Sequence, residues 1–241
     1  MTDITNLSTV NVAISNYIAV VTMNNPPVNA QNRQFHDDLT LAFDVLSDRN
    51  DVRSIVLTGA GKCFSAGADI KGRASQESDL GDHWVHSRRV RECFYSIMEC
   101  RKPVIAAING AALGAGLAVA ASADILIASE SASVGLPEIN VGLLGGGRHA
   151  MRLFGHSKTR RLMLTGQRLS GAELYRLGIV EECVPDDDLM RAALEIAEEL
   201  ASKSPVAMSL AKETLNAIEE MALRDGYRYE QNKTVDLSKT E

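Results

Sequence analysis

The sequence predicts an α/β fold that ends in a helical region. Short runs of β-branched and aliphatic residues, at 54–58, 104–108 and 125–128, alternate with segments whose apolar residues recur at helical spacing. The chain has 241 residues, 45% of them hydrophobic, which is enough to bury a sizeable core as one main domain. We therefore expect an α/β core over residues 1–184 and a helical region over residues 185–241.

The first elements follow from local residue patterns. Alternating β-branched residues at 10–14 and 18–23 predict a hairpin with Ser15-Asn16 near its turn, and Pro26-Pro27 ends the strand pattern. Apolar residues at helical spacing predict a helix over 32–48 that buries one face. They are Phe35, Leu39, Ala42, Phe43 and Leu46.

The middle of the chain alternates loops with helices. Glycines punctuate a predicted loop over 59–69, and polar and charged residues predict a mobile surface loop over 71–82, of the kind that often covers ligands. A helix is expected over 90–99. The Ala-rich segment predicts a second helix from about 114 to 122, and a loop follows over 133–147.

An acidic run opens the helical region at residues 186–188. The apolar residues that follow recur at helical spacing over 189–200, and acidic residues are favoured at a helix N-terminus. The run therefore predicts the start of a helix rather than a metal site.

Composition excludes several classes of protein. The net charge of −6 and the isoelectric point near 5.5 disfavour nucleic-acid binding, which relies on many Lys and Arg contacts to phosphate. The four cysteines lie far apart, with no C-x-x-C pair and no histidine at metal-ligand spacing, so we expect reduced thiols and a cytoplasmic protein without a metal. They are Cys63, Cys93, Cys100 and Cys183. Residues 1–10 do not resemble a secretory signal.

The longest apolar stretch, residues 104–121, does not predict a membrane span. It is rich in Ala and Gly rather than Leu, Asn109-Gly110 interrupts it, and Asp124 follows soon after. A buried strand, a turn and a helix fit this stretch better, and we expect no membrane partner.

Three common catalytic or nucleotide-binding motifs are incomplete. The segment 59–62 lacks the first Gly and the final Ser/Thr of a phosphate-binding P-loop, and 114–116 lacks the third Gly of a dinucleotide fingerprint. Neither Ser65 nor Ser157 has both glycines of a G-x-S-x-G elbow. The five histidines show no pairing, so we interpret them as surface or packing residues.

Three further segments carry chemistry in combination. They are FSAGADI at 64–70, NGAALGAG at 109–116 and GLPEINVG at 135–142. In this order and spacing they resemble the enoyl-CoA hydratase/isomerase (crotonase) family, and the likeness extends from the N-terminal hairpin to about residue 180.

The resemblance implies a fold and an assembly. It implies a crotonase-like ββα spiral (ClpP/crotonase fold) of two roughly perpendicular sheets surrounded by helices, with acyl-CoA binding and catalysis in residues 1–184. The helical region 185–241 is then a trimerisation region of a homotrimer or a dimer of trimers. Family members usually continue into another helix beyond the position of Glu241.

The resemblance also implies a site that stabilises a thioester enolate. The N–H groups of Ala68 and Ala115 match the two backbone donors of an oxyanion hole, and small residues let the backbone approach the ligand. Glu138 matches the glutamate of the family that transfers a proton, and an apolar pocket would raise its pKa toward that use. No cofactor is implied, because coenzyme A enters as part of the substrate.

Two positions depart from the pattern of the family. Ala115 stands where Gly is usual, and its methyl group is expected to narrow the acyl pocket and so to affect which acyl chains fit. Ala118 stands where two-glutamate hydratases have a second Glu, and Ala transfers no protons. Three alternatives stay open: an isomerase with a single Glu, a substrate-assisted enoyl-CoA hydratase, and a non-catalytic acyl-CoA binder.

The remaining positions concern the coenzyme. The resemblance places the backbone around Val28 and Ala30 against adenine and pantetheine, and Lys71 and Arg73 near phosphates. Asp69 and Asp124 are interpreted first as loop-fixing or capping residues. Substrate and CoA contacts are also expected at Ala66, Asp69, Ile70 and Gly114.

Overall fold

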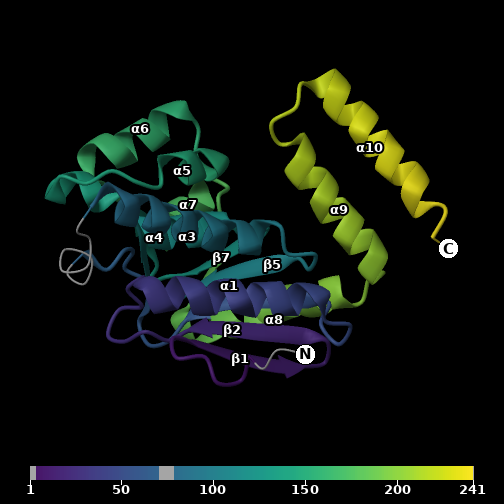
Figure 1. Cartoon of the computed structure of the whole chain (residues 1–241), viewed down its shortest axis with the longest axis horizontal. Coiled ribbons are helices and arrows are strands. Elements are labelled where there is room, and N and C mark those ends of the chain that lie inside the picture. Colours follow the sequence, from purple (N-terminus) through teal and green to yellow (C-terminus); the bar gives the residue numbers. More distant parts are fainter. Residues whose placement is uncertain (1–3, 71–78, 241) are drawn as a thin grey trace.

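Two β-sheets form the centre of the protein in a computed structural model that describes residues 4–70 and 79–240 (Figure 1). The larger sheet has the order β1-β2-β3-β5-β7-β10 and the smaller sheet the order β4-β6-β8-β9. The strands of the larger sheet are β1 Val10–Ser15, β2 Ile18–Met23, β3 Ser54–Gly59, β5 Val104–Ile108, β7 Ile125–Ser129 and β10 Cys183–Val184. Those of the smaller sheet are β4 Cys63–Ser65, β6 Ala111–Leu113, β8 Ser133–Gly135 and β9 Arg168–Ser170.

The chain visits the two sheets in turn. Strand β3 of the larger sheet leads to β4 of the smaller one, β5 leads to β6, and β7 leads to β8. Within each sheet these successive strands pair in parallel, with helices between the turns. This repeated ββα path confirms the α/β spiral expected from the sequence.

The N-terminal hairpin forms as predicted. Strands β1 and β2 pair antiparallel from Val10 opposite Met23 to Ser15 opposite Ile18. The two residues between them, Asn16 and Tyr17, have φ values of 50° and 64°. Positive φ at both central residues gives a turn whose twist matches that of the flanking strands.

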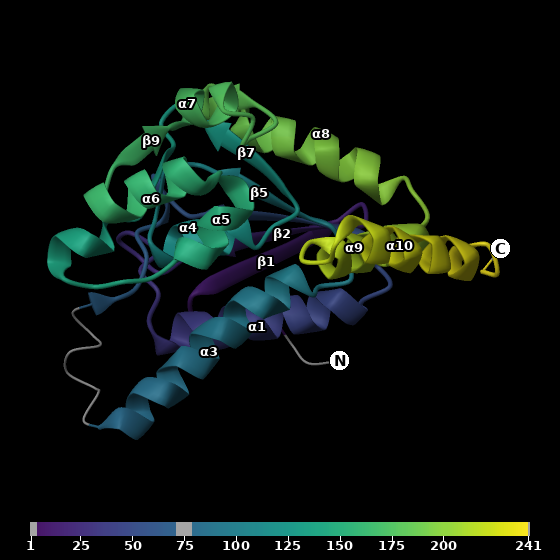
Figure 2. The same ribbon diagram turned by 90° about the horizontal axis from the view of Figure 1, so that it is seen from above.

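Helix α1, Arg33–Asp48, confirms the helix predicted over 32–48. Asn32 caps it, accepting a hydrogen bond from Phe35 N–H at 2.8 Å. The apolar stripe singled out in the sequence is fully buried, and Figure 2 shows α1 lying beside helix α3, Leu80–Met98.

The structure corrects three predicted boundaries. The loops 59–69 and 133–147 contain the short strands β4 and β8, and the 3₁₀ helix η1, Pro137–Val141, follows β8. Three-residue strands are too short to give a periodic signal. Helix α3 begins at Leu80 rather than near 90, because Asp79 caps it while its first half, including Trp84, is exposed and shows no apolar stripe. Most of the predicted loop 71–82 lies outside the described residues.

Seven helices follow η1 among the described residues. They are α5 Gly147–Leu153, α6 His156–Thr165, α7 Gly171–Arg176, η2 Asp186–Asp188, α8 Leu189–Ala201, α9 Pro205–Ile218 and α10 Leu223–Leu237. The acidic run thus forms η2 and leads directly into α8, as predicted. Helix α8 buries Ala193 and Ala197 in one apolar cluster with Val56 and Ile105 of the larger sheet.

Helices α9 and α10 lie side by side at one end of the molecule, and we call residues 205–237 the C-terminal arm (Figure 1). Lys212 attaches the arm to the core. Its ammonium group, on a side chain only 5% exposed, lies 2.8 Å from Asp124 Oδ2 and donates to Ile97 O and Lys102 O, each at 3.1 Å. A buried cation needs such a full set of acceptors.

No helix in residues 4–70 and 79–240 is long and apolar enough to cross a lipid bilayer.

A buried histidine between α1 and α3 predicts acid sensitivity. His36 is 1% exposed, neither of its ring nitrogens has a hydrogen-bond partner among the described residues, and the centroid of its ring lies 5.9 Å from that of His86. Burial, and then the charges of His86 and Arg89, lower its pKa from 6.5 to about 3. Between those two pH values the unfolded chain binds more protons than the folded one, so stability falls as the pH falls below 6.5.

We predict that lowering the pH from 7 to 5 removes about 2 kcal/mol of stability through His36 alone. The measurement is urea unfolding of the wild type and of His36→Leu at both pH values. The variant, which buries no unpaired nitrogen, should lose less stability on acidification than the wild type. An equal loss in the two proteins would contradict the prediction.

Candidate active site

The ends of three parallel strands bring the predicted site residues together. Strands β4, β6 and β8 are neighbours in the smaller sheet, so their carboxyl ends meet at one edge. The residues directly after these ends are 66–69, 114–115 and 136–138. The three separate sequence segments therefore meet because each one ends a strand of the same parallel set.

The first of these loops leaves one backbone donor free. Gln31 hydrogen-bonds both sides of Ala68: its N–H donates to Gly67 O at 2.8 Å and its carbonyl accepts from Asp69 N–H at 3.1 Å. Gly67 has φ +93°, a conformation that favours glycine. Among the described residues the N–H of Ala68 itself has no acceptor.

A buried serine supports this loop from below. The hydroxyl of Ser65 donates to Asn29 O at 2.7 Å and accepts from Gln31 Nε2 at 3.2 Å and from Gly67 N–H at 3.3 Å. Sequence reasoning missed Ser65 and Gln31 in this role. The available signal was a pair of polar residues beside an apolar strand, and only the fold shows that they meet.

The second loop leaves a second donor free. Gly114 precedes helix α4, Ala115–Ala121, with φ +56° and ψ −117°. Its own N–H donates to Gly135 O and its carbonyl accepts from Ala118 N–H, but within the described part of the chain Ala115 N–H has no acceptor. A Cβ atom built on Gly67 would lie 3.3 Å from Ala115 N, so the two loops are in contact.

The third segment brings a carboxylate to the same place. Glu138 is the second residue of η1, after Pro137, and its side chain is half-buried against Gly114, where any Cβ would collide with Glu138 Oε1. Its Oε2 atom is buried without a hydrogen-bond partner among the described residues. Burial raises the pKa of Glu138 above its usual value. A carboxylate in this condition accepts protons more readily than one in water.

Ala118 lies inside α4, 1% exposed, and gives the site no second proton carrier at that position.

The segments predicted to meet coenzyme A are adjacent, since Ala66 N–H donates to Val28 O at 3.0 Å. Val28 and Ile70 are 40% and 47% exposed, and Ala66 is also exposed.

The remaining predicted residues either make hydrogen bonds within the protein or lie outside the described residues. Ala30 O accepts from Asn25 Nδ2 at 2.6 Å. Asp124 Oδ2 accepts from Val104 N–H at 2.7 Å besides pairing with Lys212, in agreement with its interpretation as a capping residue. Lys71 and Arg73 lie outside the described residues.

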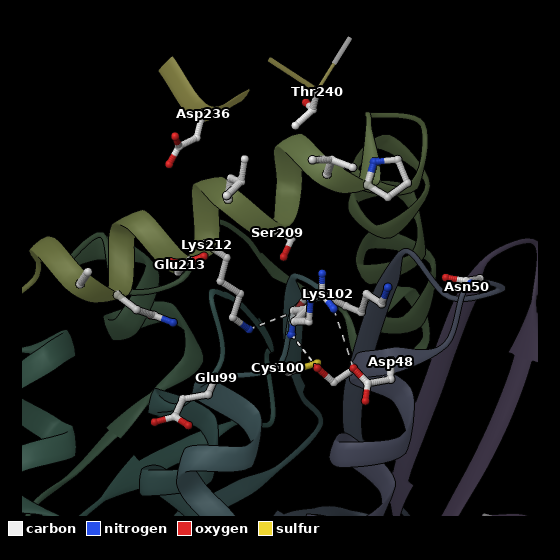
Figure 3. A pocket seen from close by; sticks show the side chains of 17 residues that line it. Asp48, Asn50, Glu99, Cys100, Lys102, Ser209, Lys212, Glu213, Asp236 and Thr240 are labelled. Atoms are coloured by element: carbon white, nitrogen blue, oxygen red, sulfur yellow. Dashed lines mark hydrogen bonds and ion pairs between the residues drawn. The ribbon is translucent and has the colours of Figure 1, made fainter. Parts of the chain in front are cut away.

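A cavity of about 920 Å³ lies elsewhere, between the ends of α1 and α3 and the C-terminal arm (Figure 3). The residues that line this cavity do not include Glu138, Ala68 or Ala115. They include acidic and basic side chains, among them Asp48, Lys102 and Glu213. Over the described residues, no group of three or more His, Cys, Asp or Glu side chains could hold a metal ion.

Comparison with known proteins identifies the family to which this fold belongs. Residues 13–241 match the family described as enoyl-CoA hydratase/isomerase, and the chain belongs to that family. This confirms the resemblance inferred from the three sequence segments.

Individual relatives cover nearly the whole chain. A protein of Dictyostelium discoideum named probable mitochondrial enoyl-CoA hydratase is 37% identical over 88% of this chain and 77% of its own length. A Mycobacterium tuberculosis protein named (7aS)-7a-methyl-1,5-dioxo-2,3,5,6,7,7a-hexahydro-1H-indene-carboxyl-CoA hydrolase is 37% identical over 92% and 89%. The solved structure of Pseudomonas aeruginosa DspI has a TM-score of 0.91, 33% identity and 97% coverage of both chains.

The support beneath Ala68 can be tested by stability. We predict that Ser65→Ala lowers the free energy of unfolding by about 2–3 kcal/mol, because Gly67 N–H and Asn29 O lose their partner in a buried place. Hydrogen exchange at Gly67 should also become faster. Urea unfolding and amide exchange provide the measurements.

Ser122→Ala is the matched control. Ser122 is equally buried, but within the described part of the chain its hydroxyl bonds only to Ala118 O, four residues earlier in the adjoining helix α4. Its loss should therefore be below about 1 kcal/mol. If the two variants lose the same stability, the hydroxyl of Ser65 has no special role in the loop.

Proposed function

We propose that this protein binds an enoyl-CoA thioester and moves a proton on its acyl chain through an enolate intermediate. The N–H groups of Ala68 and Ala115 both donate to the thioester oxygen, and Glu138 is the proton carrier. The observation that carries the proposal is the meeting of two free backbone donors with one half-buried, partly unpaired carboxylate.

The reaction begins with removal of a proton from the carbon next to the thioester carbonyl. Glu138 takes the proton, the electron pair of the C–H bond forms a double bond to the carbonyl carbon, and the π pair of the carbonyl group moves onto the thioester oxygen, which gains negative charge. Two amide donors aimed at that oxygen stabilise the charge, and loss of one such donor typically costs 2.7–4 kcal/mol, or roughly 10²–10³ in rate. The neutral Glu138 then returns the proton to a carbon.

Protonation at the far end of the dienolate shifts the double bond, which is isomerase chemistry with one carboxylate. Ala118 favours this outcome, because a two-carboxylate hydration needs a second proton carrier at that position. A substrate-assisted hydratase is the second candidate, supported by relatives named enoyl-CoA hydratase at 34–37% identity. A relative named as a CoA-ester hydrolase makes a wider set of CoA esters worth testing.

The adjacent segments at 28–30 and 66–70 supply the proposed surface for coenzyme A, with contacts from Val28, Ala30, Ala66, Asp69 and Ile70. Lys71 is proposed to meet a phosphate. The proposal requires no metal and no redox cofactor, since a proton transfer within one acyl chain is balanced by Glu138 alone. The four cysteines are free thiols, which supports a cytoplasmic location.

The decisive test replaces the proposed proton carrier. We predict that Glu138→Gln lowers kcat by about 10²–10⁴ while the dissociation constant for the CoA ester changes by less than roughly threefold, because Gln keeps the shape but carries no proton. Crotonyl-CoA, 3-enoyl-CoA and aromatic enoyl-CoA esters are incubated in heavy water, and mass spectrometry follows deuterium uptake and hydration.

Each outcome has a distinct meaning. Deuterium uptake with double-bond shift and no hydration supports the isomerase, and hydration supports the substrate-assisted hydratase. Binding without turnover in the wild type would leave an acyl-CoA binder. Because burial raises the pKa of Glu138, turnover of the wild type should fall on the acid side as the pH drops through that raised value.

The C-terminal arm supports the proposal of a homotrimer or dimer of trimers. Its surface exposes large apolar side chains, among them Leu215 at 65%, Leu223 at 90% and Tyr227 at 58%. We propose that a neighbouring subunit covers these side chains, because burial of exposed apolar area stabilises an assembly.

We predict a particle of three or six times the 26.0 kDa chain mass in sedimentation velocity. Leu223→Asp should shift it toward the monomer, since the carboxylate would lose its water at an apolar interface. Leu80→Asp is the control, because Leu80 is 73% exposed but lies on α3, outside the arm. A monomeric wild type would contradict the proposed assembly.

A further inference from the structure

The guanidinium group of Arg152 connects helix α4, which begins with Ala115 of the proposed site, to the C-terminal arm. Arg152 lies on α5, and its side chain is only 17% exposed. Its Nη1 atom donates to Ala121 O at 2.6 Å. Ala121 is the last residue of α4, the helix whose first residue, Ala115, offers the free N–H to the proposed site.

The same guanidinium is held from the other side by the arm. Arg152 Nε lies 3.0 Å and 3.1 Å from the two carboxylate oxygens of Glu219, the residue that ends α9. A planar guanidinium with several fixed donors can hold two acceptors at once in defined directions, which an ammonium group on a flexible stem does poorly. Arg152 therefore joins α4, α5 and the arm through one rigid group.

Helix α4 needs such a directional contact because its other contacts are mostly nondirectional. It is seven residues long, and its sequence, AGLAVAA, contains no polar side chain. Apolar packing resists compression but sets direction only weakly, whereas a hydrogen bond to the final carbonyl sets the position of the helix along its axis. A shift of the helix along that axis moves Ala115 N–H relative to Ala68 N–H.

We infer that Arg152 is a positioning residue for the reaction, and that Glu219 of the C-terminal arm holds it in place. Arg152 acts through α4, with no contact to substrate. The inference rests on the proposed function, since it concerns the alignment of the Ala115 donor. It goes further in making the placement of the arm a determinant of turnover.

The test measures kcat and KM for the CoA ester that the wild type turns over. Arg152→Ala should lower kcat by about tenfold with KM changed less than roughly twofold, because a misplaced donor weakens stabilisation of the enolate more than binding of the ester. Arg152→Lys keeps the charge and should recover only part of the loss. Glu219→Gln, which retains Arg152, should lower kcat by about threefold.

Arg148→Ala is the matched control. Arg148 lies one turn earlier on α5 and pairs with Glu220 of the arm, but it makes no hydrogen bond to α4 among the described contacts. The kcat of the Arg148→Ala variant should stay within roughly twofold of that of the wild type. Thermal unfolding of every variant separates a loss of fold from a loss of alignment.

Three results would overturn the inference. Unchanged kcat in a folded Arg152→Ala would remove the positioning role, and equal losses in the Arg148 and Arg152 variants would assign the effect to general docking of the arm. Unchanged kcat in Glu219→Gln would remove the link to the arm, and this variant together with Arg152→Lys decides the matter should Arg152→Ala fail to fold. Failure of the proposed function is distinct, because the wild type itself would then turn over no CoA ester.

Discussion

The N–H groups of Ala68 and Ala115 are two backbone donors on loops that the fold brings into contact, and neither has an acceptor in the described structure. Most backbone N–H groups of a folded protein are paired, and these two stay free because the acceptors near them are already bonded to neighbouring groups. Gln31 and Ser65 complete the bonds around the first donor, and Gly114 completes those around the second. The rest of the molecule can be understood as the support for this pair.

The ββα spiral provides that support in a simple way. Each turn of the chain adds one strand to the larger sheet and one short strand to the smaller sheet, which carries a loop of the candidate site. Parallel pairing in the smaller sheet places the three loops at one edge. The smaller sheet is itself anchored in the core through Phe64, Ala112 and Val134, so its loops are held by buried strands.

The carboxylate of Glu138 has a related environment. It is packed against Gly114, and one of its oxygens has no partner in the described residues, so its charged form is disfavoured. Arg152 adds a link from this region to the C-terminal arm through the far end of α4. The proposed assembly through the arm and the proposed chemistry at Glu138 are therefore connected by named contacts, in a family whose relatives are described as acting on CoA thioesters.

The sequence by itself determined the family and the α/β class, because these depend on motif spacing and local periodicity, and its resemblance to the family selected Ala68, Ala115 and Glu138 as the candidate site residues. Only the tertiary structure decided the short strands β4 and β8, the early start of α3, and the contacts of Ser65, Gln31 and Arg152. Three-residue strands have no periodic signal, and a supporting side chain is recognised by partners that are distant in sequence. Arg152 meets Ala121 31 residues away and Glu219 67 residues away, a relation that no local pattern contains.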